Sequence, residues 1–172
     1  MSTLVLGPPP AELEALIELR RKAGADRHDE VWEGVLHMAP APSHGHGRLQ
    51  WQLAAVLGPF ATAAGLEATG EVNIGAGRHD YRVPDGALHR PGADGLWHAT
   101  AALVIEILSP DDETPAKLAF YAGHAVDEVL IVDPAKREVS WLALSNGEYH
   151  ATGRSQLIEL GSAELADRLD WP

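Results

Sequence analysis

The most apolar stretch of the chain, Leu103 to Leu108, contains a single acidic residue, Glu106. Burying an ionised carboxylate without a partner is costly, so such a group is normally paired, bound to a metal ion or protonated. A second acid, Asp85, follows Pro84 on another predicted strand. Carboxylate oxygens are the ligands that hard cations such as Mg²⁺ prefer. Asp85 and Glu106 therefore predict a metal site.

Both acids also have a purely structural interpretation. Glu106 could point to water at the end of its strand, although apolar residues continue on both sides of it. Asp85 could be an ordinary turn residue, because Pro-Asp-Gly is a common turn sequence. The presence of two such acids together favours the metal site over either alternative.

The composition is that of a folded globular protein. A chain of 172 residues can form one domain with a substantial core, and 45% of its residues are hydrophobic. The absence of cysteine excludes disulfides, zinc–thiolate sites and thiol nucleophiles, and is compatible with a reducing cytoplasm. No signal-like segment and no run of about 18 apolar residues occurs. We therefore expect a single domain over residues 1–172 in a soluble cytoplasmic protein.

The formal net charge of −12 limits the binding partners of the protein. Phosphate binding relies on Lys and Arg, so nonspecific adhesion to nucleic acid or anionic lipid over the whole surface is disfavoured. A polyanionic substrate must instead bind at a local patch. The candidate cations are Arg48, Arg78, Arg82, Arg90 and Lys117.

The N-terminal part of the sequence predicts two helices and a strand. Apolar residues recur at helical spacing from Leu13 to Leu19, and Gly24 can end this helix. Residues 30–38 alternate as in a strand. Ser43 can then cap a second helix that ends near Gly65.

The middle of the sequence predicts three strands and a helix. Residues 67–74 and 79–89 form an antiparallel pair joined by a turn at Gly75-Ala76-Gly77. The strand of Glu106 has apolar residues on both faces, which is typical of a central strand. Thr114-Pro115 then begins a third helix.

The C-terminal part predicts a hairpin, an edge strand and a short helix. The hairpin turns at residues 133–136, and Asn146-Gly147 begins a second turn. The short helix begins at Ser162. The order α-β-α-β-β-β-α-β-β, followed by these last elements, predicts an α/β fold with one central mixed sheet flanked by helices.

Several short segments of the chain occur together in one known family. They are Glu30-Val31-Trp32-Glu33-Gly34, residues 41–46, Val83-Pro84-Asp85, residues 105–110, residues 117–121 and Val132-Asp133-Pro134. In this order and spacing, over about residues 30–144, the chain resembles the Uma-two-type restriction endonuclease family. This family is part of the PD-(D/E)XK nuclease superfamily, which has a restriction-endonuclease-like fold.

The resemblance implies a metal-dependent endonuclease that hydrolyses DNA phosphodiester bonds with a metal-activated water. Asp85, Glu106 and the backbone carbonyl of Ile107 would bind Mg²⁺, or Mn²⁺ in its place. Lys117 would orient the water or balance the developing charge, and Glu30 would add an outer carboxylate. Cleavage of both DNA strands would favour a homodimer, and no membrane partner is expected.

The chain departs from the superfamily pattern at the lysine. The simplest pattern places lysine two residues after the acid, where this chain has Leu108. Lys117 is expected to reach the same space from the following helix. The alternative is a solvated lysine that pairs with the acidic residues 111–113. Glu30, like Glu33, could equally be a solvent-facing acid of its strand.

His46 is the fifth candidate catalytic residue. It lies on the inward stripe of the second helix, in register with Leu49 and Leu53. It could contact a phosphate or a water, or it could be a packed and hydrogen-bonded histidine. A transition-metal site with His44 is disfavoured, because the sequence has neither helical His-x-x-x-His spacing nor cysteine.

Other functional classes find little support in the sequence. No dinucleotide fingerprint, phosphate-binding loop or Gly-x-Ser-x-Gly motif occurs, so nucleotide cofactors and serine-hydrolase chemistry are not indicated. The alternative that stays open is a noncatalytic binding or regulatory domain of the same fold. The negative net charge and the displaced lysine favour this alternative.

Overall fold

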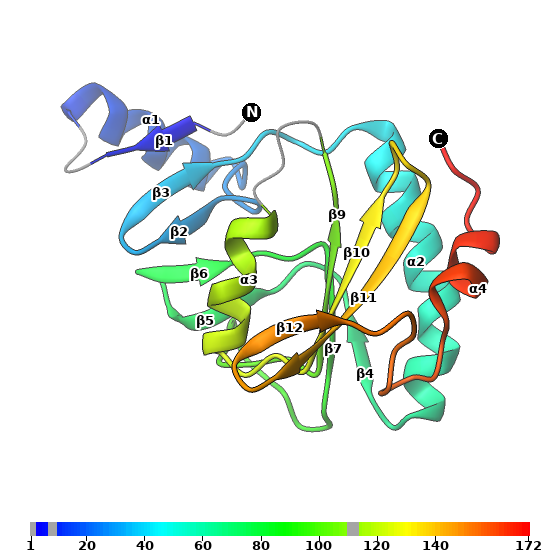
Figure 1. Ribbon diagram of the computed structural model, residues 1–172. Helices are drawn as coiled ribbons and strands as arrows, with labels where there is room; N and C mark the ends of the chain where they lie inside the picture. The colour runs from blue at the N-terminus through cyan, green and yellow to red at the C-terminus, as the bar shows by residue number, and fades with distance from the viewer. Residues whose placement is uncertain (1–2, 7–9, 110–113) are drawn as a thin grey trace.

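Two six-stranded mixed sheets and four helices form the structure (Figure 1). The computed structural model describes residues 3–6, 10–109 and 114–172. The first sheet has the order β1 (Thr3–Val5), β3 (Val35–Met38), β2 (Glu30–Trp32), β6 (Asp80–Arg82), β5 (Asn73–Gly77) and β8 (Trp97–His98). The second sheet has the order β12 (Glu148–Ala151), β11 (Glu138–Ser145), β10 (Glu128–Asp133), β9 (Leu103–Ile107), β7 (Gly86–His89) and β4 (Glu67–Thr69).

Helices cover both faces of the second sheet (Figure 1). The four helices are α1 (Ala11–Lys22), α2 (His44–Ala63), α3 (Thr114–Gly123) and α4 (Ser162–Asp167). Leu49, Leu53 and Leu57 of α2 pack with Ile105 and Ile107 in one hydrophobic cluster. A second cluster joins residues of α3 to the opposite face of the sheet through Tyr121, Val104 and Val129. None of the helices in the described part of the chain is long and apolar enough to cross a membrane.

Strand β9, which carries Glu106, is central, as its apolar pattern predicted. It pairs in parallel with β10 and antiparallel with β7, and all of its residues are buried. Its odd-numbered residues face α2, and Val104 faces the α3 side. Because side chains alternate along a strand, Glu106 projects toward α3.

Most of the other predicted elements are confirmed. The first helix ends before Gly24, and Ser43 caps α2 by accepting a hydrogen bond from the His46 amide at 3.2 Å. The third helix begins at Thr114, and the hairpins after Glu128 have the expected turns. The predicted α/β class is therefore correct, with helices flanking a mixed sheet.

Four details of the predicted topology are wrong. Residues 30–38 form a hairpin, β2 and β3, because Glu33 and Gly34 adopt left-handed conformations and turn the chain. The segment Gly75-Ala76-Gly77 lies in β5 and not in a turn. Both strands of the predicted antiparallel pair divide: residues 67–74 between β4 and β5, and residues 79–89 into β6 and β7, with β4 and β7 joining the second sheet. The strands β1 and β8 were not anticipated, and the sheet is split in two.

Candidate active site

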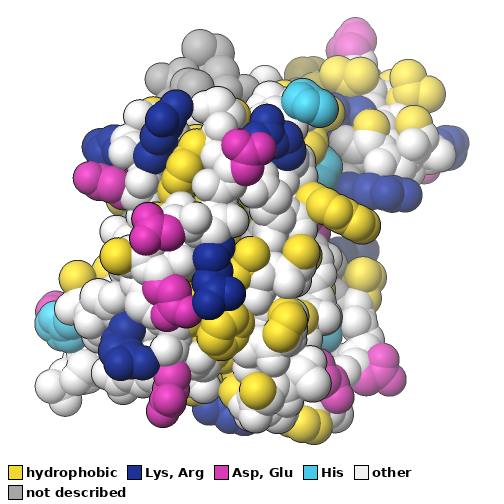
Figure 2. All heavy atoms as spheres, turned by 90° about the vertical axis from the view of Figure 1, so that its right-hand side faces the viewer, with side chains coloured by type: hydrophobic (Ala, Val, Ile, Leu, Met, Phe, Trp, Pro, Cys, Tyr) yellow, Lys and Arg dark blue, Asp and Glu magenta, His cyan; other side chains and the backbone are white. Residues whose placement is uncertain are grey.

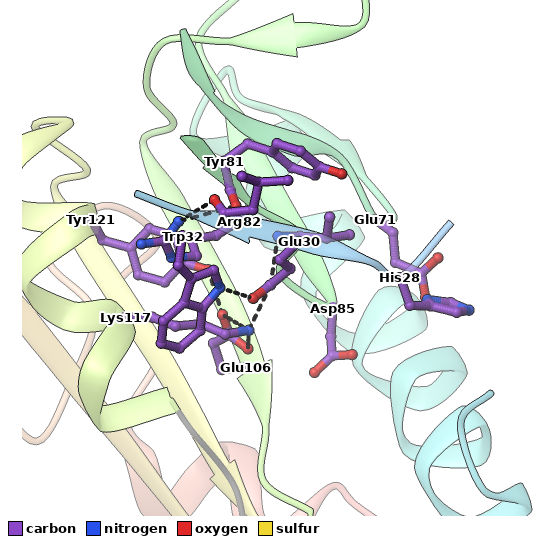
Figure 3. Close-up of polar contacts among 12 residues, drawn as sticks. His28, Glu30, Trp32, Glu71, Tyr81, Arg82, Asp85, Glu106, Lys117 and Tyr121 are labelled. Atoms are coloured by element: carbon purple, nitrogen blue, oxygen red, sulfur yellow. Dashed lines mark hydrogen bonds and ion pairs between the residues drawn. The ribbon is translucent and has the colours of Figure 1, made fainter. Parts of the chain in front are cut away.

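Asp85 and Glu106 lie at the same end of two adjacent strands. Asp85 directly precedes β7, and its amide donates to the carbonyl oxygen of Ile105 at 2.9 Å. The next residue, Gly86, pairs with Ile105 in the antiparallel ladder. The amide of Ile107 donates to Oδ2 of Asp85 at 2.7 Å. These contacts place the Asp85 carboxylate beside the end of β9 (Figure 3).

Helix α2 fixes the position of Asp85. Nε2 of His46 lies 2.7 Å from Oδ1 of Asp85. The side-chain amide of Gln50, one turn further along, donates to the Asp85 carbonyl at 2.8 Å. The Ser43 cap orients the first turn of this helix. His46 therefore faces the candidate site, as its place on the inward stripe predicted.

Helix α3 brings Lys117 to Glu106. Nζ of Lys117 lies 3.2 Å from both carboxylate oxygens of Glu106. One turn later, the Tyr121 hydroxyl donates to Oε1 of Glu106 at 2.5 Å. Residues separated by four positions share a helix face, which explains why both side chains reach the same carboxylate.

The first sheet supplies Glu30 to the same cluster. Nζ of Lys117 lies 2.9 Å from Oε1 of Glu30, so the lysine bridges two carboxylates that come from different sheets (Figure 3). The Trp32 indole donates to Oε2 of Glu30 at 2.7 Å, and the Val83 amide donates to Oε1 at 2.8 Å. Glu30 is thus held by three donors.

The burial of these side chains excludes the solvent-facing alternatives for Glu106, Glu30 and Lys117. Glu106 and Glu30 are only 4% and 7% exposed, so neither is a solvent-facing acid. The Lys117 side chain is 13% exposed, so it is not a solvated helix lysine. Its predicted alternative partners, residues 111–113, lie outside the described residues. Glu33 does not reach the cluster, because it lies in the turn after β2.

The electrostatics of the cluster follow from its burial and its excess of acid. Burial raises the pKa of Glu106 to about 8; Lys117 opposes this rise, and the nearby Asp85 and Glu30 carboxylates add to it. Burial alone would lower the pKa of Lys117, but Glu106 and Glu30 outweigh it and raise that pKa. Burial and the same carboxylates raise the pKa of Tyr121, so its hydroxyl stays a donor.

The donor set has the chemistry that a hard cation requires. Mg²⁺ keeps several of its waters and is usually bound through one or two carboxylates, so it needs no complete protein cage. Asp85 and Glu106 offer two carboxylates, and that of Asp85 is close enough to raise the pKa of Glu106. Within residues 3–6, 10–109 and 114–172, no three His, Asp or Glu side chains form a ready-made cage. This arrangement fits Mg²⁺ better than Zn²⁺, which favours nitrogen and sulfur ligands.

Three residues that contact the cluster were not singled out by the sequence analysis. They are Tyr121, Trp32 and Gln50, each of which contributes one of the hydrogen bonds described above. Tyr121 had a detectable signal, since it follows Lys117 by one helical turn. Trp32 binds Glu30 from two residues further along the same strand, whereas Gln50 binds Asp85 across elements that are distant in sequence and carries no local signal.

Arg82 packs on the outer side of this cluster. Its guanidinium carbon lies 4.5 Å from the ring centre of Trp32 and 4.0 Å from that of Phe120. It also donates to the Val31 carbonyl at 2.8 Å. Arg82 thus contacts α3 through Phe120 and a second strand of its own sheet through Trp32, in two cation–π contacts.

Three of the five cations of the predicted local basic patch are buried or paired with acids, whereas Arg78 is exposed and donates to the His79 ring at 3.4 Å. Arg82 is buried, Arg90 pairs with Asp127 at 2.8 Å, and Arg48 pairs with Asp170. On the side of the molecule that carries α2 and α4, cationic and acidic side chains are intermingled (Figure 2). Lys117 is the one of the five candidates that lies in the cluster.

Comparisons with known proteins identify the fold. A family model described as "Uma2: Putative restriction endonuclease" matches residues 11–166. A crystal structure described as a putative nuclease belonging to DUF820, from Anabaena variabilis, has a TM-score of 0.66 at 18% identity and covers 81% of this chain and 90% of its own. A DrdV–DNA complex aligns at 16% identity with a TM-score of 0.41, covering 90% of this chain and 13% of that one. No curated protein matches the chain.

Proposed function

Because the chain belongs to the Uma2 family of restriction-endonuclease-like proteins, we propose that it is a Mg²⁺-dependent endonuclease that hydrolyses DNA phosphodiester bonds. The observation that supports this proposal best is the position of Lys117. Its ammonium bridges Glu106 and Glu30, with Asp85 beside them, so all the candidate charges meet at one strand end.

We assign the binding of Mg²⁺ to Asp85, Glu106 and the Ile107 carbonyl. When bound, Mg²⁺ would supply charge stabilisation at the scissile phosphate and a more acidic water. His46 and the Ile107 amide each hold one oxygen of Asp85, which limits the orientation of that carboxylate. Tyr121 and Lys117 similarly orient Glu106.

Lys117 supplies a positive charge close to the reacting phosphate. Its ammonium lies between two acids and is kept protonated by them, so it can donate to an oxygen of the phosphate or to the attacking water. Glu30 fixes the ammonium in place, which gives this residue a positioning role. The buried surroundings strengthen each of these interactions.

The test is metal-dependent nicking of supercoiled DNA. The parent protein is expected to nick the plasmid with Mg²⁺ and not with chelator, and Asp85→Ala, Glu106→Ala and Lys117→Ala are expected to lose this activity. Lys136→Ala is the matched control, because that lysine is exposed and pairs with the turn residue Asp133 at 2.9 Å, away from the cluster. Nicking that survives in Lys117→Ala would refute the role of the ammonium.

A noncatalytic nuclease-fold domain is the second candidate. The pairing of Arg48 and Arg90 with acids favours it, because these two cations are not free to bind DNA. Under this alternative, calorimetry would detect Mg²⁺ binding that depends on Asp85 and Glu106, while no substrate is cut. Absence of Mg²⁺ binding in the parent protein would contradict the Mg²⁺-dependent endonuclease and leave a noncatalytic domain without an ion.

We further propose that residues 1–172 act as one domain and that two copies cooperate in cutting both DNA strands. Sedimentation of the protein with a short duplex measures this directly. A complex of one chain per duplex that still makes double-strand breaks would contradict the dimer.

A further inference from the structure

A cavity of about 190 Å³ lies beside Asp85, between α2 and the second sheet. Helix α2 forms one wall, and residues at the ends of β4, β7 and β9 form the others. Most of its lining is aliphatic or glycine, as in Leu53, Gly86 and Ile105. The proposed metal chemistry uses Asp85 but leaves the rest of this cavity without a role.

The cavity has the size and chemistry to receive one aromatic ring system. An apolar protein cavity of about 150 Å³ is large enough to bind benzene, and this cavity is somewhat larger. Polar groups lie at its edge. The Gln50 side chain donates to Asp85 and Glu71, and its own carbonyl oxygen accepts no hydrogen bond from the described residues. A flat ring with polar edge groups is complementary to such a lining.

The charge near the cavity excludes an anionic occupant. Asp85 lines it, and Glu71 contacts Gln50 at its edge. A phosphate placed inside would face these carboxylates, whereas a neutral ring would not. The phosphate of a bound nucleotide would instead lie toward Lys117, on the other side of Asp85.

Trp51 provides a second, independent observation. Its side chain is 80% exposed, which is unusual for such a large apolar group on a well-packed helix. Ala54 and Gly58, three and seven residues later on α2, line the cavity. Because residues at these spacings share a helix face, Trp51 lies on the same side of α2 as these two lining residues. Exposed indoles are stacking surfaces for nucleic-acid bases.

We propose that this cavity, together with Trp51 on the same side of α2, binds an unpaired nucleobase of the strand that is cut. The proposal rests on the nuclease function proposed above and adds a base-binding site to it. An extruded base would place its own phosphate next to Asp85, because the cavity and the metal site share this residue. The enzyme would then act preferentially on single-stranded or easily unpaired DNA.

Photocrosslinking tests the proposal without requiring cleavage. A thymine oligonucleotide with one 5-iodouracil is irradiated with the full-length protein in Ca²⁺, and the crosslinked peptide is identified by mass spectrometry. The crosslink is expected on Trp51. Ala54→Leu, which fills the cavity from an exposed helix position, is expected to abolish it. Ala55→Leu is the matched control, because Ala55 is exposed and does not line the cavity.

Affinity gives a second measurement. Loss of one base–aromatic stack reduces binding by about 5- to 150-fold, so Trp51→Ala is expected to weaken oligonucleotide binding within this range. Thermal unfolding of each variant separates loss of the site from loss of the fold. A crosslink elsewhere, or an Ala54→Leu variant that behaves like Ala55→Leu, would overturn the base-binding site. Nicking by the parent protein is measured separately, so failure of the nuclease function leaves the crosslink readable.

Discussion

Replacing Glu106 by glutamine should make the protein more stable at alkaline pH. The ordinary pKa of this carboxyl is 4.5, and burial raises it to about 8. The unfolded chain therefore releases the proton at lower pH than the folded chain, and stability falls as the pH rises between these two values. Glutamine keeps the acceptor for Tyr121 and has no proton to lose.

The magnitude follows from the same pKa. Each pKa unit corresponds to about 1.4 kcal/mol, so the rise from 4.5 to about 8 is equivalent to roughly 5 kcal/mol of unfolding free energy. The attraction of Lys117 is already included in this value, because it lowers the pKa of Glu106. The advantage of Glu106→Gln should thus be near zero below about pH 4.5 and reach roughly 5 kcal/mol above about pH 8.

Urea denaturation of the parent protein and of Glu106→Gln in chelator, over a series of pH values, measures this difference. All other titrating groups are common to both proteins, so the difference reports this carboxyl together with its interactions with Lys117 and Tyr121. Glu138→Gln is the control, because Glu138 is exposed in β11. If the two free energies of unfolding stay parallel from about pH 5 to pH 9, the carboxyl is not destabilised by burial and the reasoning fails.

Three further predictions concern the metal. Mg²⁺ binding near neutral pH should release about one proton, since the Glu106 carboxyl must ionise to bind the ion. Calorimetry in two buffers of different ionisation enthalpy measures the proton release. Equal binding heats in the two buffers would contradict this prediction. Lys117→Met should lower cleavage by about 10²- to 10³-fold yet tighten Mg²⁺ binding, because the ammonium no longer competes for Glu106 and Glu30. Weaker binding would argue that the lysine supports the site in another way. His46→Ala should reduce Mg²⁺ affinity by about 10- to 100-fold, since it frees one oxygen of Asp85, whereas the exposed His44→Ala should have no effect.

Local signals in the sequence were sufficient to predict the elements that carry Glu106, Lys117 and His46. The apolar run around Glu106 predicted a central strand, and the Thr114-Pro115 pair predicted the start of the helix that carries Lys117. Ser43 predicted the cap that orients His46. Each of these signals depends on neighbouring residues or on one periodicity within a single element. It can therefore be recognised in the sequence without knowledge of the rest of the fold.

The split into two sheets could not be predicted in this way, because strand pairing depends on contacts between distant residues. Gly75 illustrates the difficulty. A Cβ atom at this position would lie 2.5 Å from the carbonyl oxygen of Asp80 in the neighbouring strand. Glycine is required here for close approach of two backbones, but in the sequence it indicates a turn equally well. The prediction also missed the separation of β6 from β7, which leaves Asp85 directly before a strand.

The displaced lysine has a structural consequence for the site. Residues 106 and 108 lie on the same face of an extended chain, so a lysine at 108 would approach Glu106 along its own strand. Here Lys117 approaches from α3 and also reaches Glu30, which belongs to the other sheet. Arg82 belongs to that sheet and packs between its Trp32 and Phe120 of α3. The charge at the site therefore depends on how the first sheet packs against α3. For this reason, Arg82→Met should misplace Lys117 and lower cleavage, while Mg²⁺ affinity falls little. Calorimetry and plasmid nicking on one preparation measure the two quantities together. Unchanged cleavage, or a loss of Mg²⁺ affinity as large as the loss of cleavage, would refute this prediction.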